Sequence, residues 1–237
     1  MTQPAVLLTN RLLLLYQSSI GKKLLTGITG LTLALFVTVH MLANLTLFFS
    51  PAAYNQFGHV VEQLWPLTYL IELVLALGVI LHASLGIQIW RTKRRARREA
   101  YAVYLSAGQA TENPSYQNLS SRSMVVSGIV LGVFLVWHLL TFKFGLRYAV
   151  SGTEMRDLAR LVIETFQQPL YTVSYVTVFG LLALHLRHGL WSAWQSLGAL
   201  NRHLRPLAYS LSLAMAVLLA LGFGALPLAI YFGLLSQ

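Results

Sequence analysis

Five long, predominantly apolar stretches constrain this chain more than any other feature of its sequence. A stretch of 18 or more such residues forms a helix long enough to cross the hydrocarbon core of a bilayer. Only 10% of the 237 residues are charged, whereas a soluble domain usually has about 25%. The sequence therefore predicts an all-α membrane protein, a single integral membrane domain over residues 1–237, with five transmembrane helices in a bundle at about 24–49, 67–90, 123–146, 170–196 and 207–235.

The net charge of +10 is unevenly distributed over the connections between these spans. With the N-terminus and the even-numbered connections on one side, that side has 13 of the 17 Lys and Arg residues. Basic loops stay in the cytoplasm. We therefore expect a bacterial-type inner membrane protein with a cytoplasmic N-terminus on this inner side and an external C-terminus on the outer side. The basic cluster at 91–98 then fits lipid headgroups and topology rather than nucleic acid.

Each connection on the outer side predicts a short helix lying on the membrane. Ser50 and Pro51 have the pattern of an N-cap followed by proline in the first turn. Residues 151–168 have an amphipathic pattern, with Ser151 and Glu154 at capping-box spacing. Both helices would cover whatever opens on the outer face of the bundle.

Four histidines lie inside apolar spans and fall at two depths. With a rise of about 1.5 Å per residue, His40 and His138 lie roughly 5 Å from the middle of their spans toward the outer side. His82 and His185 lie a few ångströms toward the inner side, because their spans run in the opposite direction. The sequence thus predicts two layers, each with histidines from two different helices.

Two imidazoles from neighbouring helices are the ligand set of six-coordinate haem b, and a helix bundle accommodates the flat macrocycle. Glycines one turn from a ligand let the ring approach the backbone, as Gly78 and Gly86 do around His82 and Gly189 after His185. The absence of cysteine excludes thiolate-held iron–sulfur clusters and covalent c-type haem. We therefore predict two haem b groups whose iron is held by His40 with His138 (outer) and His82 with His185 (inner).

Other roles for buried histidines fit parts of this pattern. A histidine in a span often forms a hydrogen bond between helices, and zinc gathers four ligands at one place. A haem-free transporter with a proton relay would bring carboxylates to the midplane, whereas Glu72 is close to the outer end of its span. His188 is three residues from His185, so only one of them can ligate, and His188 is a candidate to bind a propionate.

Several short motifs occur in a familiar order, namely "SSIGKKLLTGITGL" at 18–31, "HMLAN" at 40–44, "LHASLG" at 81–86, "WHLL" at 137–140 and "GLWSAW" at 189–194. With these motifs the chain resembles the single-chain, five-helix, di-haem cytochrome b anchor of succinate:quinone oxidoreductases (succinate dehydrogenase and fumarate reductase). The resemblance covers nearly the whole chain and implies the same two ligand pairs. It also implies a flavoprotein subunit that oxidises succinate, and an iron–sulfur subunit that docks on the basic inner face.

The resemblance further implies that a quinone, generally menaquinone, reacts on the outer side near the outer haem. Candidates to exchange protons with a quinol there are Glu62, Glu72 and His59. Candidates to bind the outer propionates are Lys143 and Arg147, and for the inner propionates Lys22, Lys23, Thr26, Arg91 and Arg187. The Lys and Arg residues among these candidates would equally fit a role as interfacial side chains, with the charged group in the headgroup region and the apolar stem in the membrane.

The expected function is that of the membrane anchor and cytochrome b subunit of succinate dehydrogenase. This subunit passes electrons between the iron–sulfur subunit and (mena)quinone and binds no dicarboxylate. Two alternatives stay open at this point: a di-haem cytochrome b that serves a hydrogenase or formate dehydrogenase, and a haem-free transporter that uses the same histidines.

Overall fold

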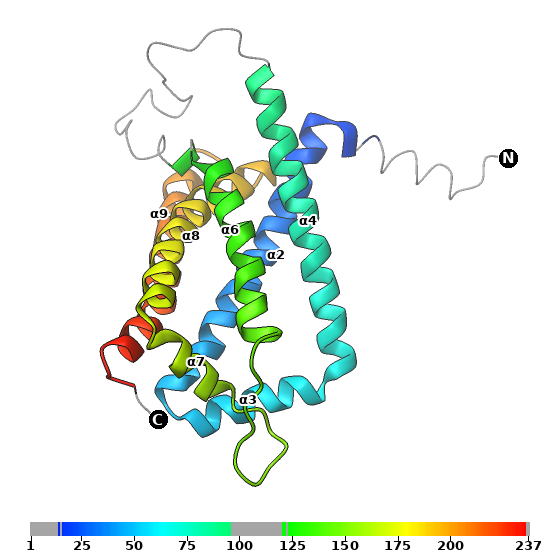
Figure 1. Ribbon diagram of the computed structural model, residues 1–237. Coiled ribbons are helices and arrows are strands. Elements are labelled where there is room, and N and C mark those ends of the chain that lie inside the picture. The colour runs from blue at the N-terminus through cyan, green and yellow to red at the C-terminus, as the bar shows by residue number, and fades with distance from the viewer. Residues whose placement is uncertain (1–13, 15, 96–119, 122, 236–237) are drawn as a thin grey trace, which may run out of the picture.

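The computed structural model describes residues 14, 16–95, 120–121 and 123–235, and these form a bundle of long helices (Figure 1). Five of them are long and apolar enough to cross a membrane, the third including the π-helical turn η2 (Leu139–Lys143). The predicted all-α fold with five membrane-spanning helices is thereby confirmed, while the enclosed haems stay a prediction. The five are α2 (Ser19–Leu45), α4 (Trp65–Arg95), α6 (Met124–His138), α8 (Pro169–Ser196) and α9 (Leu204–Tyr231).

Two of these helices end five or more residues away from the ends of the predicted spans. Helix α4 continues beyond residue 90 into the basic cluster and reaches Arg95, and most of the predicted inner loop 91–122 lies outside the described residues. Helix α6 ends at His138, where the backbone widens into η2 and the amide of Phe144 donates to the carbonyl of Leu139 at 2.9 Å. Such π-helical turns are frequent at functional sites.

Both predicted outer helices are present, and one of them begins where the sequence indicated. Helix α3 (Pro51–Gln63) follows Ser50, whose hydroxyl accepts from the amide of Ala53, and Pro51 is in its first turn. A short 3-10 turn, η1 (Thr46–Phe48), connects it to α2. These caps satisfy amides that have no partner within the helix.

The predicted start of the second outer helix is wrong. Helix α7 (Leu158–Phe166) is capped by Asp157, whose carboxylate accepts from the amide of Arg160 at 3.0 Å, and not by Ser151. The chain first reverses through a turn in which Gly152 has φ of 74°, and residues Ala149 and Arg156 pair across this turn as an isolated bridge. A backbone that is already reversed cannot also form the first helical turn at residues 151–154.

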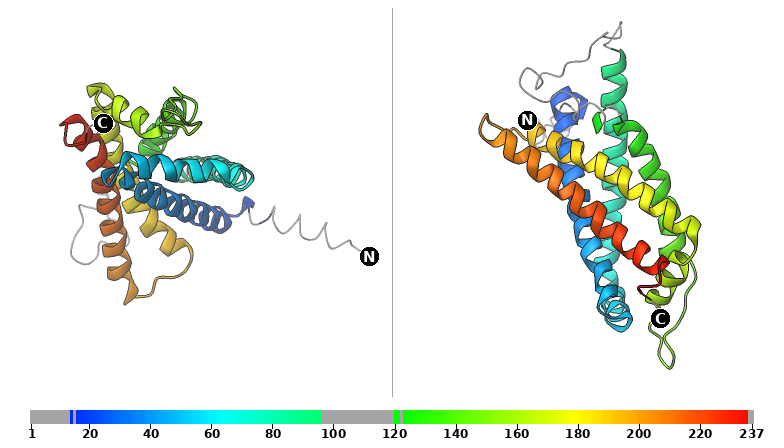
Figure 2. Two further views of the ribbon diagram at one scale, coloured as in Figure 1. Left: turned by 90° about the horizontal axis from the view of Figure 1, so that it is seen from below. Right: turned by 90° about the vertical axis from the view of Figure 1, so that its left-hand side faces the viewer.

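Helix α2 contacts α4, α8 and α9, while α6 packs on α8. Helices α8 and α9 lie side by side along most of their length (Figure 2). Helices α3 and α7 contact each other and cross one end of the bundle, which we call the outer end (Figures 1 and 2).

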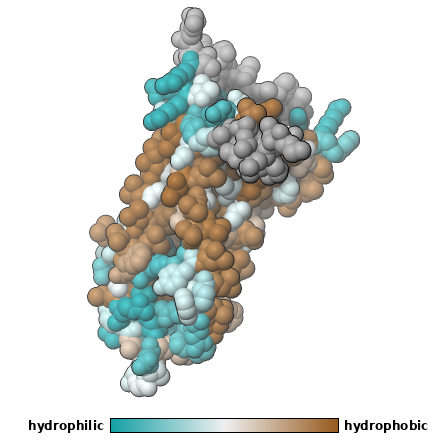
Figure 3. All heavy atoms as spheres, turned by 90° about the vertical axis from the view of Figure 1, so that its right-hand side faces the viewer, coloured by the Kyte–Doolittle hydropathy of each residue, from teal (hydrophilic) through white to brown (hydrophobic). Residues whose placement is uncertain are grey.

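The sides of the bundle are apolar at the surface as well as inside. Leu35, Val133 and Leu221 are each about two-thirds exposed, although large apolar side chains are normally buried in a soluble protein. Figure 3 shows an apolar band between two hydrophilic ends. This distribution is that of a multi-pass membrane protein whose apolar sides face lipid.

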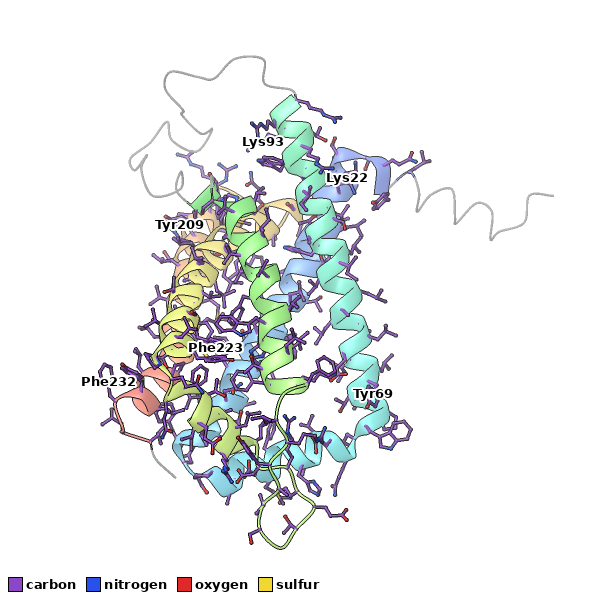
Figure 4. All side chains as sticks on the ribbon, in the orientation of Figure 1. Lys22, Tyr69, Lys93, Tyr209, Phe223 and Phe232 are labelled. Atoms are coloured by element: carbon purple, nitrogen blue, oxygen red, sulfur yellow. The ribbon has the colours of Figure 1, made fainter. Side chains whose placement is uncertain are left out.

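The two ends of the bundle differ in their side chains. Lys22, Lys93 and Tyr209 gather at one end, Tyr69 lies toward the other, and Phe223 points into the interior between them (Figure 4). The end with Lys22 and Lys93 is the one that the charge distribution assigns to the cytoplasm. The orientation of the bundle in the membrane stays a prediction.

Candidate functional site

The four buried histidines meet in two pairs, each formed across two helices. His40 of α2 faces His138 of α6, with 5.8 Å between the ring centroids and 90° between the ring planes. His82 of α4 faces His185 of α8, with 6.4 Å and 62°. These are the two pairs that the depth of each histidine in its span predicted.

The separation of the inner rings fits one metal ion on the axis between two imidazoles, and the separation of the outer rings is about 0.6 Å shorter than that spacing. A bond between a first-row metal and imidazole nitrogen is about 2 Å long. The centre of an imidazole ring is about 1.2 Å from its nitrogen, given ring bonds of about 1.3 Å. Two such bonds and two such radii place the centroids about 6.4 Å apart. The angle between the ring planes is free, since each ring can rotate about its own metal bond.

Hydrogen bonds leave the second ring nitrogen of the inner histidines available. The Nδ1 of His82 is 3.1 Å from the carbonyl of Thr26 and 3.2 Å from the hydroxyl of Thr29. The Nδ1 of His185 is 3.0 Å from the hydroxyl of Ser127. Both hydroxyls donate their hydrogens to carbonyls of their own helices, so their oxygens accept from Nδ1–H. The acceptor at Nδ1 fixes the tautomer and leaves the lone pair on Nε2 for a metal.

The outer histidines lie among aromatic rings. The Nδ1 of His138 is 3.3 Å from the hydroxyl of Tyr175, which is only 2% exposed. The ring of His138 stacks on Phe134, and that of His40 stacks on Phe36. Within the described part of the chain, the His40 ring has ring contacts but no hydrogen bond. The surroundings of this pair are therefore apolar, as the face of a porphyrin requires.

The space next to two glycines near the inner pair is open. A Cβ placed on Gly86 or Gly189 would have no described heavy atom within 4 Å. Gly30 of α2 is different, because it lies against one of the inner histidines. A Cβ on Gly30 would lie 2.9 Å from Cε1 of His82, so this imidazole rests directly on the backbone of α2. Gly30 was not among the residues that the sequence indicated, although it lies one turn after Thr26.

The positions of Thr29 and Ser127, the hydroxyl partners of the inner histidines, give the distance between the inner and outer histidine pairs along the helices. Eleven residues separate Thr29 from His40 on α2, and eleven separate Ser127 from His138 on α6. At the helical rise this is about 16 Å on either helix. The two independent helices therefore place the outer pair at the same height above the inner pair.

A cavity of about 600 Å³ opens beside the outer pair and has His40 in its wall. It lies between the outer ends of α2, α3 and α4 and the segment from η2 to α7. All the residues that the resemblance suggested for outer propionates and quinol protons line this cavity: His59, Glu62, Glu72, Lys143 and Arg147.

The charged candidates pair with one another across the cavity. The ammonium of Lys143 forms an ion pair with Glu72, which connects η2 to α4. The guanidinium of Arg147 is 3.5 Å from the carboxylate of Glu62 on α3. His59 contacts the amide of Gln63 one turn along α3 at 3.0 Å. The charges of Lys143 and Arg147 are thus offset by carboxylates of this chain.

Two further residues of the cavity wall were missed from the sequence. The hydroxyl of Tyr54 donates to the side chain of Asn44, whose amide donates to the carbonyl of His40. Burial raises the pKa of Tyr54. Arg156 donates to the carbonyls of Phe142 and Leu146, at 2.8 and 3.2 Å, and burial and the nearby Arg147 lower its pKa. Their only signal was position, since both belong to the outer connections.

A buried amide holds the two outer helices together above this cavity. Asn55 of α3 is 5% exposed, and its Nδ2 donates to Asp157 at 2.8 Å. Its Oδ1 accepts from the amide of Ala159 at 2.8 Å. Both halves of the side-chain amide are therefore used to fix α3 against the start of α7.

The inner candidates lie at the basic end of the bundle. The hydroxyl of Thr26 donates to the carbonyl of Lys22 within α2, and the guanidinium of Arg187 donates to Tyr209 of α9. Lys23 and Arg91 are exposed. Their contact with inner propionates stays a prediction, as does that of His188.

Comparison with known proteins adds no evidence to the geometry of the site. No family model, curated protein or solved structure matches this chain. The resemblance to the di-haem anchor subunits therefore rests on the short motifs and the histidine positions of the sequence.

Proposed function

We propose that this chain is the membrane anchor and di-haem cytochrome b subunit of a succinate dehydrogenase, the respiratory complex II. The observation that supports this most is the pairing of four histidines in two layers, with ring centroids 5.8 and 6.4 Å apart, close to the spacing of two imidazoles on one metal ion. Two histidine ligands would suit electron transfer, because they would leave no position on the iron open to oxygen.

Residues of this chain would hold each haem and set its ligand chemistry. His82 and His185 would ligate the inner iron, with their tautomers fixed by Thr29 and Ser127. His40 and His138 would ligate the outer iron. When bound, haem b supplies a one-electron couple at each layer. The layers, about 16 Å apart along the helices, would connect the inner end of the bundle with the outer cavity.

The outer cavity is the proposed quinone site. It is next to His40, and its wall combines apolar and aromatic side chains with the carboxylates of Glu62 and Glu72. A quinol that gives up two electrons also releases two protons, and Glu62, Glu72 and His59 would accept them. Menaquinone is the quinone that the resemblance implies.

The distribution of acidic residues favours electron transfer over a proton-relay transporter. The described carboxylates are Glu62, Glu72, Glu154, Asp157 and Glu164, and all lie in the outer connections or, for Glu72, near the outer end of α4. A relay through the middle of the membrane would need acidic partners at that depth.

The basic inner end is the proposed docking face for the iron–sulfur subunit, which in turn carries the flavoprotein. The test is to purify the tagged chain from its own membrane and add succinate. We expect a flavoprotein and an iron–sulfur protein to copurify and succinate to reduce a b-type α band. If the band appears but only hydrogen or formate reduces it, the partner is a hydrogenase or formate dehydrogenase and the proposal is wrong.

A further inference from the structure

One buried polar atom in the described part of the chain has no hydrogen-bond partner, and it belongs to the outer cavity. It is Nε of Arg156. The other end of the guanidinium is fixed, because Nη2 donates to the carbonyls of Phe142 and Leu146. The direction of the Nε–H bond is thereby set by the backbone around η2. A buried donor left without an acceptor costs about 1–3 kcal/mol, and more when it is charged.

Arg156 is also the cation that remains when the charges of the cavity are paired. Glu72 pairs with Lys143 and Glu62 with Arg147. Among the residues that the structure describes, no carboxylate forms an ion pair with Arg156. A guanidinium keeps its charge even when burial lowers its pKa. The wall therefore has one positive charge in excess, beside a donor with no acceptor.

Arg156 lies near the outer histidine pair. Phe142, whose carbonyl holds Arg156, packs its ring on that of His138 with 5.3 Å between centroids. His40 and Arg156 are both in the wall of the same cavity. An anionic group reaching outward from a molecule between the two histidines would meet Arg156.

We propose that Arg156 binds a carboxylate of the molecule held by His40 and His138, one of the two propionates of the outer haem. This inference rests on the proposed function, and it replaces Lys143 and Arg147 as the expected contacts. A carboxylate supplies the charge and the acceptor that Arg156 lacks, and guanidinium groups bind carboxylates with particular directionality. The phosphate of a lipid headgroup offers the same anionic oxygen from a different source.

The experiment compares haem b with its dimethyl ester, in which both carboxylates are blocked. Each is titrated in phospholipid-free nonionic detergent into apoprotein with the His185→Ala substitution, which restricts binding to the outer pair. We expect the ester to bind about 10- to 100-fold more weakly than haem b when Arg156 is present. In Arg156→Gln, haem b should lose most of that factor while the ester loses little, and Arg156→Lys should restore part of it.

The matched control is Arg160→Gln, since Arg160 is an exposed outer arginine already paired with Glu164. It should keep the full difference between haem b and ester. Retention of the inner haem in Arg156→Gln, with His185 intact, shows that the variant folds. Equal binding of haem b and ester to Arg156 protein, or equal weakening of both by Arg156→Gln, would overturn the proposal. Loss of copurifying anionic phospholipid in Arg156→Gln, with the haem-to-ester ratio unchanged, would identify the lipid and also overturn it. If neither compound binds any variant, the proposed function itself fails.

Discussion

Replacing Ser127 with alanine removes a single oxygen that the structure places behind an inner ligand. Ser127 is 1% exposed, and its Oγ lies 3.0 Å from Nδ1 of His185. Without it, the Nδ1–H group is left buried without that acceptor, at a cost of about 1–3 kcal/mol. That cost corresponds to about 5- to 150-fold in an equilibrium constant. Loss of a hydrogen-bond partner behind a metal ligand typically weakens metal affinity about 10- to 100-fold, so the two estimates agree.

The assay titrates haem b into apoprotein with the His138→Ala substitution, so that only the inner pair binds. We expect the dissociation constant to rise about 10- to 100-fold in Ser127→Ala and to recover substantially in Ser127→Thr, which keeps the hydroxyl. Ser84→Ala is the matched control, because Ser84 is exposed on α4 two residues after His82. If Ser127→Ala binds inner haem as tightly as the control does, the hydrogen bond does not set the ligand tautomer.

Four further substitutions test other parts of the account. Alanine at His40 or His138 should remove the outer haem and leave the inner one, which a haem-to-protein ratio measures. Gly30→Ala should weaken the inner haem, because the new methyl group would lie 2.9 Å from Cε1 of His82 and displace the ring; inner-haem titration measures this. Asn55→Ala should lower the free energy of unfolding by about 1–3 kcal/mol, since the half-buried carboxylate of Asp157 and the buried amide of Ala159 lose their hydrogen bonds; the thermal midpoint in detergent reports it.

Each of these variants has a control or a contrary outcome. Gly132 is exposed and a Cβ on it meets no described atom within 4 Å, so Gly132→Ala should leave both haems unchanged. Gln56 is exposed beside Asn55, and Gln56→Ala should keep the wild-type midpoint. An unchanged haem ratio in His40→Ala would contradict the outer assignment. Equal midpoints for the Asn55 and Gln56 variants would show that the amide bridge between α3 and α7 stabilises nothing.

The histidine pairs were predictable because a helix has a fixed rise. Position along a span gives depth, and two histidines at equal depth on neighbouring helices can meet across the bundle. The partners behind them were not predictable in the same way. Thr29, Ser127 and Tyr175 each belong to a different helix from the histidine they contact, and the spans contain many other hydroxyls. Their selection depends on helix rotation, which packing determines.

The ion pairs of the outer cavity join residues that are far apart in the sequence, so they were not predictable from it. Position along the chain suggests Lys143 and Arg147 as propionate contacts, and it does not show that Glu72 and Glu62, 71 and 85 residues away, pair with them in the fold. Local signals also compete. Ser151 has an N-cap pattern, yet the turn at Gly152 delays the helix until Asp157 can cap it. The unpaired charge of Arg156 follows only from the fold, because it depends on Lys143 pairing with Glu72 and Arg147 pairing with Glu62.

The most direct measurement is the haem content of the purified chain, taken with its reduced-minus-oxidised spectrum. The account predicts a b-type α band and two haems per chain, both low-spin with two imidazole ligands. A chain that folds and purifies from its membrane without any such band, or whose haem content survives loss of all four buried histidines, would contradict it.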